Sequence, residues 1–508
     1  MKNNHFRTVN PSTNKNIPID YPQASIEEVN QSVILAKDAF ISYRGKSQIQ
    51  RAAFLRQIIV CLNNLKEEII SICHLETALP LGRLEGEFLR TTGQISMFAD
   101  LLENGSWVDA IIDTAQPDRK PTPRVDLRQM LIPLGPVAVF GASNFPLAFS
   151  VAGGDTISAL ASGCTVVVKS HPEHPGTSKF LANAITDALS LCDLPEAVFQ
   201  LLQGDTHQLG AELVQHPEIK AVGFTGSFSG GKALFDLANQ RPEPIPVFAE
   251  MGSVNPVLIL PNTLASNGAE IAKGLAQSVS LGVGQFCTNP GLVFFVDSEG
   301  SDEFLTTLDK LVQEIPSATM LSPSISGNYK IGLTRLKRTP KLTSVTKGIE
   351  SEDANCARTE FFITDFDTFC SIDYLSEEVF GPVSLLVSVS EEQINSIPSQ
   401  LAGQLTASIF GDPQDLIRYK HSIESITHLV GRIIINGYPT GVEVTHAMVH
   451  GGPFPATTQV QSTSVGTQAI RRFTRPVCYQ NFTQDLLPDE LKDDNPLMIS
   501  RKINGIIK

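Results

Sequence analysis

The sequence predicts an α/β protein with two parallel sheets, each covered by helices on both faces. Short apolar strands alternate with stretches of helical length, and polar residues follow where several strands end. The length of 508 residues is too great for one hydrophobic core. We therefore expect two doubly wound domains, with the ligand at the carboxyl ends of the strands.

Composition and charge exclude several classes of protein. The net charge of −14 argues against nucleic acid or an anionic membrane as the main partner. No run of roughly 18 apolar residues and no secretory signal are present, so we expect a cytoplasmic protein. The eight cysteines form no Cys-x-x-Cys pair, which argues against a disulfide framework and a structural zinc site.

The N-terminal region reads as helical. Ser25-Ile-Glu-Glu28 is a capping box that opens a helix with apolar residues at helical spacing up to Gly45. Helical pattern continues from about Gln48 to Met97. Around 116–124 the composition changes to Pro, Asp, Arg and Lys, which indicates an exposed connection.

Two series of strands follow. The first comprises Val137–Phe140, Val166–Val168, Ala221–Phe224 and Val247–Ala249, with helical stretches such as Ser178–Leu191 between them. The second comprises Val257–Leu260, Leu292–Val296, Val383–Val387, Leu405–Ile409 and Arg432–Ile435. After about Thr483 the chain is rich in Asp, Lys and Pro, and we expect a mobile tail or a surface wrap.

Three polar residues are candidates for chemistry. Cys287 lies in Gly284-Gln-Phe-Cys-Thr-Asn-Pro-Gly291, although one cysteine among eight is more often packing than nucleophile. Glu250 follows a strand and either caps a turn or acts as a general base, particularly if burial raises its pKa toward neutrality. Asn144 follows another strand and either makes an Asx turn before proline or donates to an oxyanion.

Four motifs in register resemble the aldehyde dehydrogenase family from about residue 7 to residue 482. They are Asn144-Phe-Pro146, Glu250-Met-Gly-Ser-Val-Asn-Pro256, Gly284-Gln-Phe-Cys-Thr288 and Glu377-Glu-Val-Phe-Gly-Pro382. The resemblance implies that Cys287 is the nucleophile, Glu250 the base and Asn144 the oxyanion donor. The implied reaction is NAD(P)-dependent oxidation of an aldehyde to a carboxylic acid through a cysteine thiohemiacetal and a thioester.

The cofactor site is also implied by this resemblance, because no Gly-x-Gly-x-x-Gly fingerprint follows a strand. Lys169 is expected at the adenosine ribose or its phosphate, and Glu378 and Phe380 at the nicotinamide ribose. The residues expected to bind the cofactor are Lys169, His171, Gly226, Ser227, Gly231, Glu378 and Phe380.

The residues after Lys169 favour NADP, with NAD as the alternative. Many NAD-preferring relatives have a glutamate three residues after this lysine, where this chain has Pro172. The absence of that carboxylate removes repulsion of a 2′-phosphate, and His171 or Lys169 would add attraction, whereas Glu173 would oppose it.

We expect no metal. His171 with His174, and His446 with His450, have suitable spacing, but neither pair has a Glu or Cys at ligand spacing.

The substrate prediction depends on segments near the C-terminus. Asn436-Gly-Tyr-Pro-Thr-Gly-Val-Glu-Val444 and His450-Gly-Gly-Pro-Phe-Pro-Ala-Thr-Thr458 resemble the branch that oxidises 2,5-dioxopentanoate (α-ketoglutaric semialdehyde) or, with NADP, fatty aldehydes. We favour 2,5-dioxopentanoate, oxidised to 2-oxoglutarate. Its carboxylate needs a cation, whereas a fatty aldehyde needs an apolar tunnel. The candidate cations are Arg83, Arg90, Arg432 and Arg475, and the candidate apolar substrate-binding residues are Phe145, Phe149, Phe286 and Phe454.

The resemblance also implies a domain plan. Residues 1–117 and 133–252 form the cofactor-binding domain, 253–455 the catalytic domain, and 483–508 a C-terminal tail. A hairpin at 118–132 and a strand at 468–482 form a β oligomerisation element, so we expect a homodimer or homotetramer. The remaining alternatives are a catalytically silent binding protein and a thioesterase.

Overall fold

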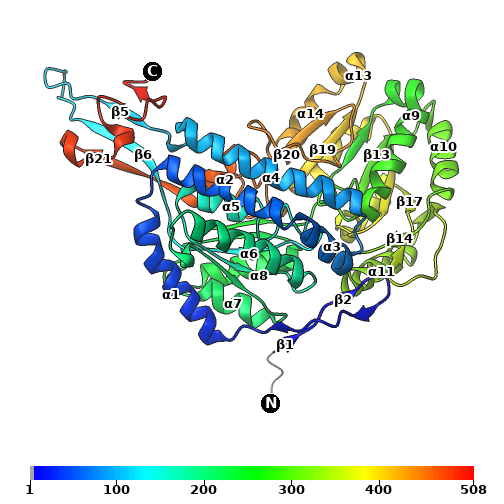
Figure 1. The fold of residues 1–508 in the computed structure, drawn as a ribbon. Helices are drawn as coiled ribbons and strands as arrows, with labels where there is room; N and C mark the ends of the chain where they lie inside the picture. The colour runs from blue at the N-terminus through cyan, green and yellow to red at the C-terminus, as the bar shows by residue number, and fades with distance from the viewer. Residues whose placement is uncertain (1–4) are drawn as a thin grey trace.

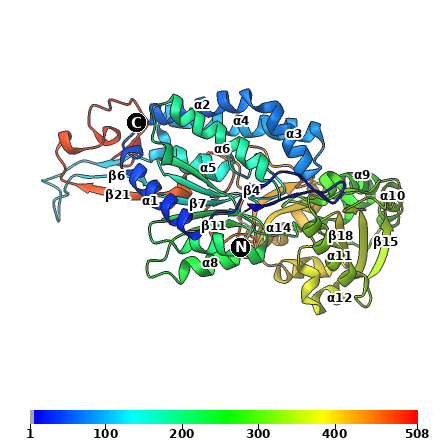
Figure 2. The same cartoon turned by 60° about the horizontal axis from the view of Figure 1, so that its bottom comes forward.

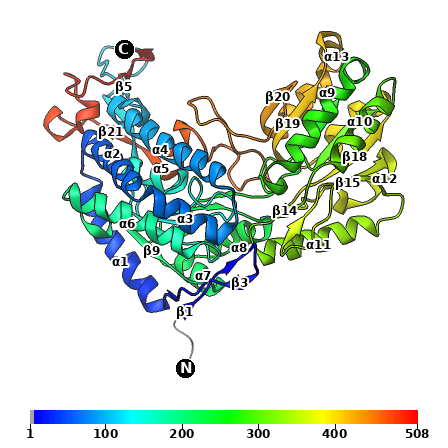
Figure 3. The same ribbon diagram turned by 45° about the vertical axis from the view of Figure 1, so that its right-hand side comes forward.

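The computed structural model describes residues 5–508, which form two α/β lobes and a β extension (Figure 1). One lobe contains the first sheet and the other the second sheet, and Figure 3 shows them as the two arms of an open V. The two large sheets are mainly parallel and alternate with helices along the chain, which confirms the α/β class predicted from the sequence.

The first sheet has five parallel strands in the order β11-β10-β7-β8-β9. Their bounds are β7 (Val137–Phe140), β8 (Val166–Lys169), β9 (Phe199–Leu202), β10 (Ala221–Thr225) and β11 (Val247–Glu250). Four of them lie within one residue of the predicted strands, and β9 was not predicted. The helices of this lobe are α1 (Ile26–Tyr43), α2 (Gln48–Asn64), α3 (Lys66–Thr77), α4 (Leu81–Asn104), α5 (Gly154–Ser162), α6 (Pro175–Leu191), α7 (His207–Gln215) and α8 (Phe228–Asn239).

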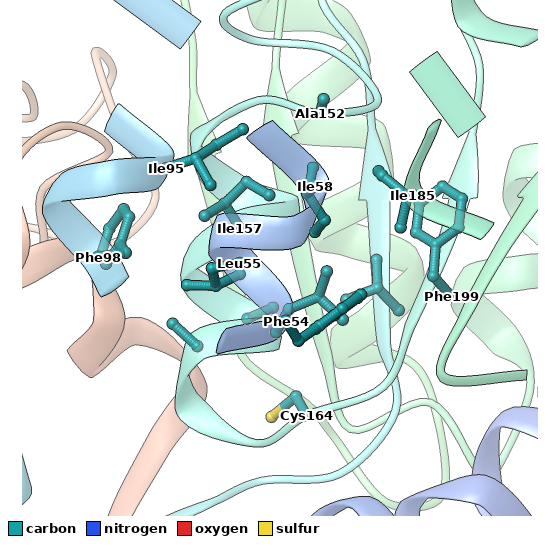
Figure 4. Packing of buried hydrophobic residues seen from close by; sticks show 14 of the residues in the cluster. Phe54, Leu55, Ile58, Ile95, Phe98, Ala152, Ile157, Cys164, Ile185 and Phe199 are labelled. Atoms are coloured by element: carbon teal, nitrogen blue, oxygen red, sulfur yellow. The ribbon is translucent and has the colours of Figure 1, made fainter. Parts of the chain in front are cut away.

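Alternate residues of these strands face two different cores, as the two-residue period of a strand requires. Val137 and Val139 face a core shared with α2 and α4–α6, and Figure 4 shows the tightly packed part around Phe54 of α2. Ala138 and Phe140 face a core shared with α1, α7 and α8. Helices therefore cover both faces of the sheet.

The second sheet has seven strands in the order β15-β17-β18-β13-β12-β19-β20. All neighbouring pairs are parallel except β15 with β17, and β15 is an edge strand that was not predicted from the sequence. The strands are β12 (Val257–Ile259), β13 (Leu292–Val296), β15 (Thr343–Lys347), β17 (Glu360–Asp365), β18 (Val383–Val389), β19 (Gln404–Phe410) and β20 (Val430–Ile435). The helices are α9 (Pro261–Ser280), α10 (Ser301–Gln313), α11 (Pro323–Lys337), α12 (Phe366–Ser371), α13 (Pro413–Arg418) and α14 (Lys420–Thr427).

The third sheet forms the extension and has the order β21-β6-β5-β22-β23. Its strands are β5 (Ile111–Asp113), β6 (Leu127–Pro133), β21 (Thr474–Gln480), β22 (Lys502–Ile503) and β23 (Ile506–Ile507). The hairpin predicted at 118–132 therefore has its first strand earlier in the chain, because β5 pairs with the beginning of β6. The domain boundaries stay a prediction, and the strands of the first and second sheets fall on either side of the boundary at 252/253.

The C-terminal segment is an integral part of this extension. β22 pairs in parallel with β5, and Leu487, Leu491 and Ile499 are buried in the core beneath α2 and α4. Of the two arrangements expected for this segment, a mobile tail or a surface wrap, the structure has the wrap. Figure 2, like Figure 1, places the C-terminus at the end of the molecule that carries the β extension, and the N-terminal strands beside the junction of the two lobes.

The remaining strands are short and antiparallel in pairs: β1 (His5–Phe6) with β4 (Tyr21–Pro22), β2 (Val9–Asn10) with β3 (Lys15–Asn16), and β14 (Ala318–Thr319) with β16 (Cys356–Ala357). Among residues 5–508, no helix combines the length and the apolar character needed to cross a bilayer.

Candidate active site

Cys287 lies on a tight loop between α9 and β13. Gly284 begins the loop with a φ of +64°, and a Cβ there would lie 2.3 Å from the carbonyl of Gly381. Only glycine combines this conformation with so close an approach. The Asn255 side chain donates to the Cys287 carbonyl at 2.8 Å. The loop therefore holds a partly exposed thiol in a fixed position.

Glu250 is the last residue of β11 and its side chain is buried. It forms an antiparallel bridge with Thr457, and the next residue, Met251, donates its N–H to the carbonyl of Ala456 at 2.8 Å. The segment at 456–457, which follows the last strand of the second sheet, thus returns and pairs with the carboxyl end of the first sheet. This return fixes the carboxylate near the junction of the two lobes.

His450 stands between the nucleophile and the base proposed from the sequence. Its Nε2 is 3.3 Å from Cys287 Sγ and 2.8 Å from Glu250 Oε1. Its backbone N–H donates to Thr463 Oγ1 at 2.9 Å, and the Ser464 hydroxyl donates to Glu250 Oε2. The structure therefore brings Cys287 and Glu250 together through a buried histidine.

Sequence reasoning missed this role of His450. The histidine was considered only with His446 as a metal pair, and the structure separates the two, since His446 contacts Thr467 instead. Cys287 lies 163 residues before His450, so no local spacing links them. The available signal was the His450-Gly-Gly segment, which places a histidine in a distinctive stretch after the last predicted strand.

The pKa of Glu250 is lowered, contrary to the expectation that burial would raise it toward neutrality. Burial does favour the neutral acid, but the charge and hydrogen bonding of His450 and the hydroxyl of Ser464 outweigh it. The pKa of the Cys287 thiol is raised well above its ordinary value by burial and then by Glu250, while Arg90 acts in the opposite direction. The resting pair is thus an ionised carboxylate beside a protonated thiol.

Asn144 lies on the loop after β7, and its side chain is buried beside the cysteine loop. Its amide donates to the carbonyl of Gln285 at 3.0 Å, two residues before Cys287. An amide group has two N–H donors, so one remains for an oxyanion formed at the cysteine.

The residues expected around the adenosine end of the cofactor lie at the carboxyl ends of the first sheet. Lys169 ends β8, and burial lowers the pKa of its ammonium group to about 8. Ser227 is the N-cap of α8 and accepts from Gly230 N–H at 3.2 Å, with Gly226 just before it. Gly231 faces Met251, where a Cβ would lie 2.7 Å from its side chain. An exposed helix N-terminus with a nearby lysine suits a pyrophosphate and a ribose phosphate.

His171 does not supply the positive charge that was expected of it. Burial, and then the charge of Lys169, lower the pKa of His171 far below its ordinary value, and its ring stacks on His174 at 5.3 Å. The ring is therefore uncharged at neutral pH. Glu173 is 3.9 Å from His171 and accepts from the Ser324 hydroxyl at 2.6 Å.

The residues expected at the nicotinamide end line one pocket. Glu378, Phe380, Phe286 and Ser253 all contribute to its wall. A Cβ on residue 252 would lie 2.4 Å from the Glu378 carboxylate. Only a glycine at this position therefore leaves room for the carboxylate, two residues after Glu250. The pocket thus runs beside the cysteine loop.

Three of the four phenylalanines expected at the substrate form one cluster. The ring of Phe145 lies 5.4 Å from that of Phe149 and 5.5 Å from that of Phe286. Phe149 in turn lies 6.3 Å from the ring of His450. Phe454 lies apart, because it packs on Phe228 at the start of α8 and is largely exposed.

Two arginines of α4 cover this cluster. The guanidinium of Arg90 lies 5.4 Å from the ring of Phe149, and that of Arg83 lies 4.9 Å from the ring of Phe286. Arg83 also donates to the carbonyl of Asn144 at 2.7 Å. The buried Nε and Nη2 of Arg90 have no hydrogen-bond partner within residues 5–508.

The other two candidate arginines differ in position. Arg432 of β20 donates to the loop carbonyls of Pro439 and Gly441 and thereby holds that loop. Arg475 lies on the exposed strand β21 of the third sheet, away from the cysteine loop.

The sequence profile of the aldehyde dehydrogenase family matches residues 1–474. The chain belongs to the aldehyde dehydrogenase family.

Two relatives are similar over nearly the whole chain. An alpha-ketoglutaric semialdehyde dehydrogenase of Acinetobacter baylyi is 47% identical over 490 residues, which cover 96% of this chain and 93% of the relative. Alpha-ketoglutaric semialdehyde dehydrogenase 2 of Azospirillum brasilense is 46% identical over 505 residues, which cover 98% of this chain and 96% of the relative.

Solved structures share the aldehyde dehydrogenase fold. A lactaldehyde dehydrogenase aligns with a TM-score of 0.80 at 20% identity, over 95% of this chain and 96% of that chain. The glyceraldehyde-3-phosphate dehydrogenase GapN of Methanocaldococcus jannaschii, complexed with NADP, aligns with a TM-score of 0.78 at 18% identity, over 94% and 99%. Against proline utilization A from Bdellovibrio bacteriovorus the TM-score is 0.80 at 20% identity, with 96% of this chain covered, but the chain spans only 50% of that protein.

As an aldehyde dehydrogenase, the protein is an oxidoreductase that acts on aldehydes with NAD(P). The described residues suit that cofactor, because a lysine ends β8, a helix N-terminus follows β10, and a pocket beside the cysteine loop includes residues that follow β11.

Proposed function

We propose that this aldehyde dehydrogenase oxidises 2,5-dioxopentanoate to 2-oxoglutarate. The observation that carries the proposal is the unpaired guanidinium of Arg90 in the aromatic cluster beside the cysteine. The names of the two similar relatives support the same substrate.

Arg90 is suited to bind the carboxylate at the far end of this substrate. Its buried Nε and Nη2 lack partners among the described residues, and a buried donor without a partner is costly. A carboxylate accepts two parallel hydrogen bonds from a guanidinium group. The ring of Phe149 contacts Arg90 on one side and His450 on the other. The short carbon chain of the substrate would therefore lie along Phe149, with its carboxylate at Arg90 and its aldehyde at the thiol.

The same arrangement disfavours a long-chain aldehyde. Arg90 and Arg83 lie over the rings that would otherwise form an apolar tunnel, and buried nitrogens of both guanidinium groups lack a hydrogen-bond partner among residues 5–508. An alkyl chain placed there would bury unpaired cations, at a cost of several kcal/mol for each ion.

The chemistry proposed for the chain's own residues begins at Cys287. The partly exposed thiol loses its proton to solvent as the sulfur attacks the aldehyde carbon, while the Nε2–H of His450, which donates to Glu250 at 2.8 Å, lies 3.3 Å from the sulfur. The free N–H of Asn144 and the Cys287 backbone N–H stabilise the oxyanion. Bound NAD(P) supplies the hydride acceptor that turns the thiohemiacetal into a thioester.

Glu250 then activates water for hydrolysis of the thioester. Its lowered pKa keeps the carboxylate ionised at neutral pH, so it is ready to accept a proton from water. Ser464 and His450 hold its two oxygens, which orients the carboxylate toward the sulfur.

We propose NADP as the preferred cofactor, with NAD as the alternative. Pro172 leaves no carboxylate three residues after Lys169, and Glu173 is held by the Ser324 hydroxyl. Lys169 is the cation that supports this preference, since His171 is uncharged.

The deciding experiment compares kcat/KM for 2,5-dioxopentanoate, succinate semialdehyde, pentanal and a long-chain aldehyde, each with NADP and NAD. Arg90→Met removes the charge at similar volume. We expect it to lower kcat/KM for the two semialdehydes about 10- to 100-fold and to leave pentanal nearly unchanged. Arg475→Met, on the exposed strand, is the matched control and should change neither.

Other outcomes lead to other functions. A wild-type preference for the long-chain aldehyde would favour a fatty aldehyde dehydrogenase. Binding of aldehyde without cofactor reduction would favour a silent binding protein, and acid release from a thioester without aldehyde oxidation a thioesterase.

A further inference from the structure

The protein brings three side chains of metal-ligating type together at the candidate active site. Glu250, Cys287 and His450 each offer one ligand atom, and these atoms all lie within 4.8 Å of one another. They come from the end of β11, the loop after α9 and the chain after β20. The spacing of metal-ligating residues along the sequence therefore could not predict this group.

The distances between the ligand atoms suit one small ion. Sγ of Cys287 is 3.3 Å from Nε2 of His450, which is 2.8 Å from Oε1 of Glu250. Ligand atoms around a tetrahedral zinc ion stand roughly 3.5 Å apart, given bond lengths of about 2.0–2.3 Å. Shifts of well under 1 Å would thus open the triangle enough for the ion.

Each of the three ligands is held by a partner outside the triangle. Asn255 holds the carbonyl of Cys287 at 2.8 Å, and the hydroxyl of Ser464 holds the second oxygen of Glu250. Thr463 holds the backbone of His450 at 2.9 Å. Such outer partners orient ligands and raise metal affinity.

We propose that Glu250, Cys287 and His450 form a reversible inhibitory site for a borderline divalent cation of the Zn²⁺ class. The fourth coordination position holds water, since the thiol is partly exposed. The site is independent of which aldehyde the enzyme oxidises.

Binding is a ligand exchange without a redox change. The hydrated ion keeps one water and exchanges the others for sulfur, nitrogen and oxygen ligands, and the protons on Cys287 Sγ and His450 Nε2 go to solvent. Because the sulfur lone pair is then bound to the metal, it cannot attack an aldehyde. The sulfur and nitrogen donors select Zn²⁺ over Mg²⁺, which prefers oxygen ligands in octahedral geometry.

The test measures the inhibition of the full-length enzyme by Zn²⁺ and its binding to the enzyme without substrate. We expect one Zn²⁺ per chain by titration calorimetry, inhibition at matching concentrations, full recovery on adding a chelator, and no inhibition by Mg²⁺. Co²⁺ should give a thiolate charge-transfer band that is absent in Cys287→Ser.

His450→Asn removes one ligand and His446→Ala is its control, because His446 is an exposed histidine four residues earlier. We expect His450→Asn to weaken zinc binding at least about tenfold and His446→Ala to leave it unchanged. Glu250→Gln should also weaken binding, which keeps the test valid if one variant misfolds.

Equal zinc binding by wild type, His450→Asn and Glu250→Gln would overturn the proposal, since the cysteine alone would then bind the ion. Absence of zinc binding to the wild-type chain would also overturn it. Because calorimetry and the cobalt spectrum need no turnover, either result is separable from failure of the proposed substrate.

Discussion

At the scale of residues, the reactivity of Cys287 is set by charges of both signs. Burial and the carboxylate of Glu250 raise the pKa of the thiol, and the cation of Arg90 lowers it. The resting thiol is therefore protonated, and the proposed attack requires loss of that proton to solvent.

The first prediction concerns the pH dependence of thiol alkylation. The thiolate fraction rises as pH increases toward the raised pKa, so the rate of reaction with iodoacetamide should still rise above pH 9, the ordinary thiol value. Glu250→Gln removes a neighbouring negative charge, lowers the pKa and should shift the profile to lower pH. Glu377→Gln is the control, because that carboxylate is exposed and pairs with Arg335 at 2.7 Å. An unshifted profile for Glu250→Gln would contradict this account.

The second prediction concerns the deacylation step. Glu250→Gln should keep one burst of reduced cofactor per site and lose steady turnover, because the thioester accumulates without its base. Cys287→Ala should lose the burst as well and still bind the cofactor. Rapid mixing with nicotinamide absorbance measures both, and normal turnover of Glu250→Gln would exclude this role for the carboxylate.

Motifs explain which of these residues could be predicted from the sequence. Cys287, Glu250 and Asn144 stand in contiguous family motifs, and the structure places them around one loop. His450 acts across 163 residues, and the effect of its charge on the pKa of Glu250 depends on a contact that only folding creates.

At the scale of elements, the composition of the C-terminal wrap left two arrangements open, a mobile tail and a surface wrap. Contacts of Arg128 in β6 hold the wrap in place, because its guanidinium donates to the carbonyl of Leu491 at 2.6 Å and pairs with Asp493 at 2.7 Å. Leu487, Leu491 and Ile499 of the wrap are buried, whereas others of its apolar residues, such as Met498, are exposed.

The third prediction tests this packing. Leu491 is fully buried, whereas Leu486, five residues earlier, is 70% exposed. Leu491→Ala should cost about 2–5 kcal/mol of local stability, and Leu486→Ala under about 0.5 kcal/mol. Limited proteolysis of the segment after Thr483 and thermal unfolding measure the difference. Equal protease resistance of the two variants would show that the wrap is not packed as described.

The strands of the two large sheets were predictable because each is a short apolar run ended by polar residues. The antiparallel strand β15 was not predictable. Its residues, Thr343–Lys347, show only a weak alternation of polar and apolar side chains, and most of them are exposed at the edge of the sheet. Strand β5 was not predicted because it has only three residues and because an irregular loop separates it in the sequence from its partner, β6.

At the scale of the whole molecule, strand β21 leaves an open edge on the third sheet. It pairs with β6 on one side, and Arg475, Pro476, Cys478 and Gln480 are exposed along it. An exposed strand edge is a ready partner for another strand. The homodimer or homotetramer expected from the sequence stays a prediction that this edge supports.

The fourth prediction places a charge on that edge. In a two-fold symmetric pair, Cys478→Glu would bring like charges close together and should reduce the mass in solution to that of one chain. Cys370→Glu makes the same exchange at an exposed site in α12 and should leave the mass unchanged. Light scattering after size exclusion measures both. An assembly that tolerates Cys478→Glu would not use this edge.

The return of the chain from the second sheet to the end of β11 has a consequence for biosynthesis. Cys287 leaves the ribosome long before His450 and Ser464, which contact Glu250 in the finished protein. A nascent chain that stops short of residue 464 therefore carries the nucleophile without its neighbours. Translation would have to reach this late segment before the first catalytic turnover.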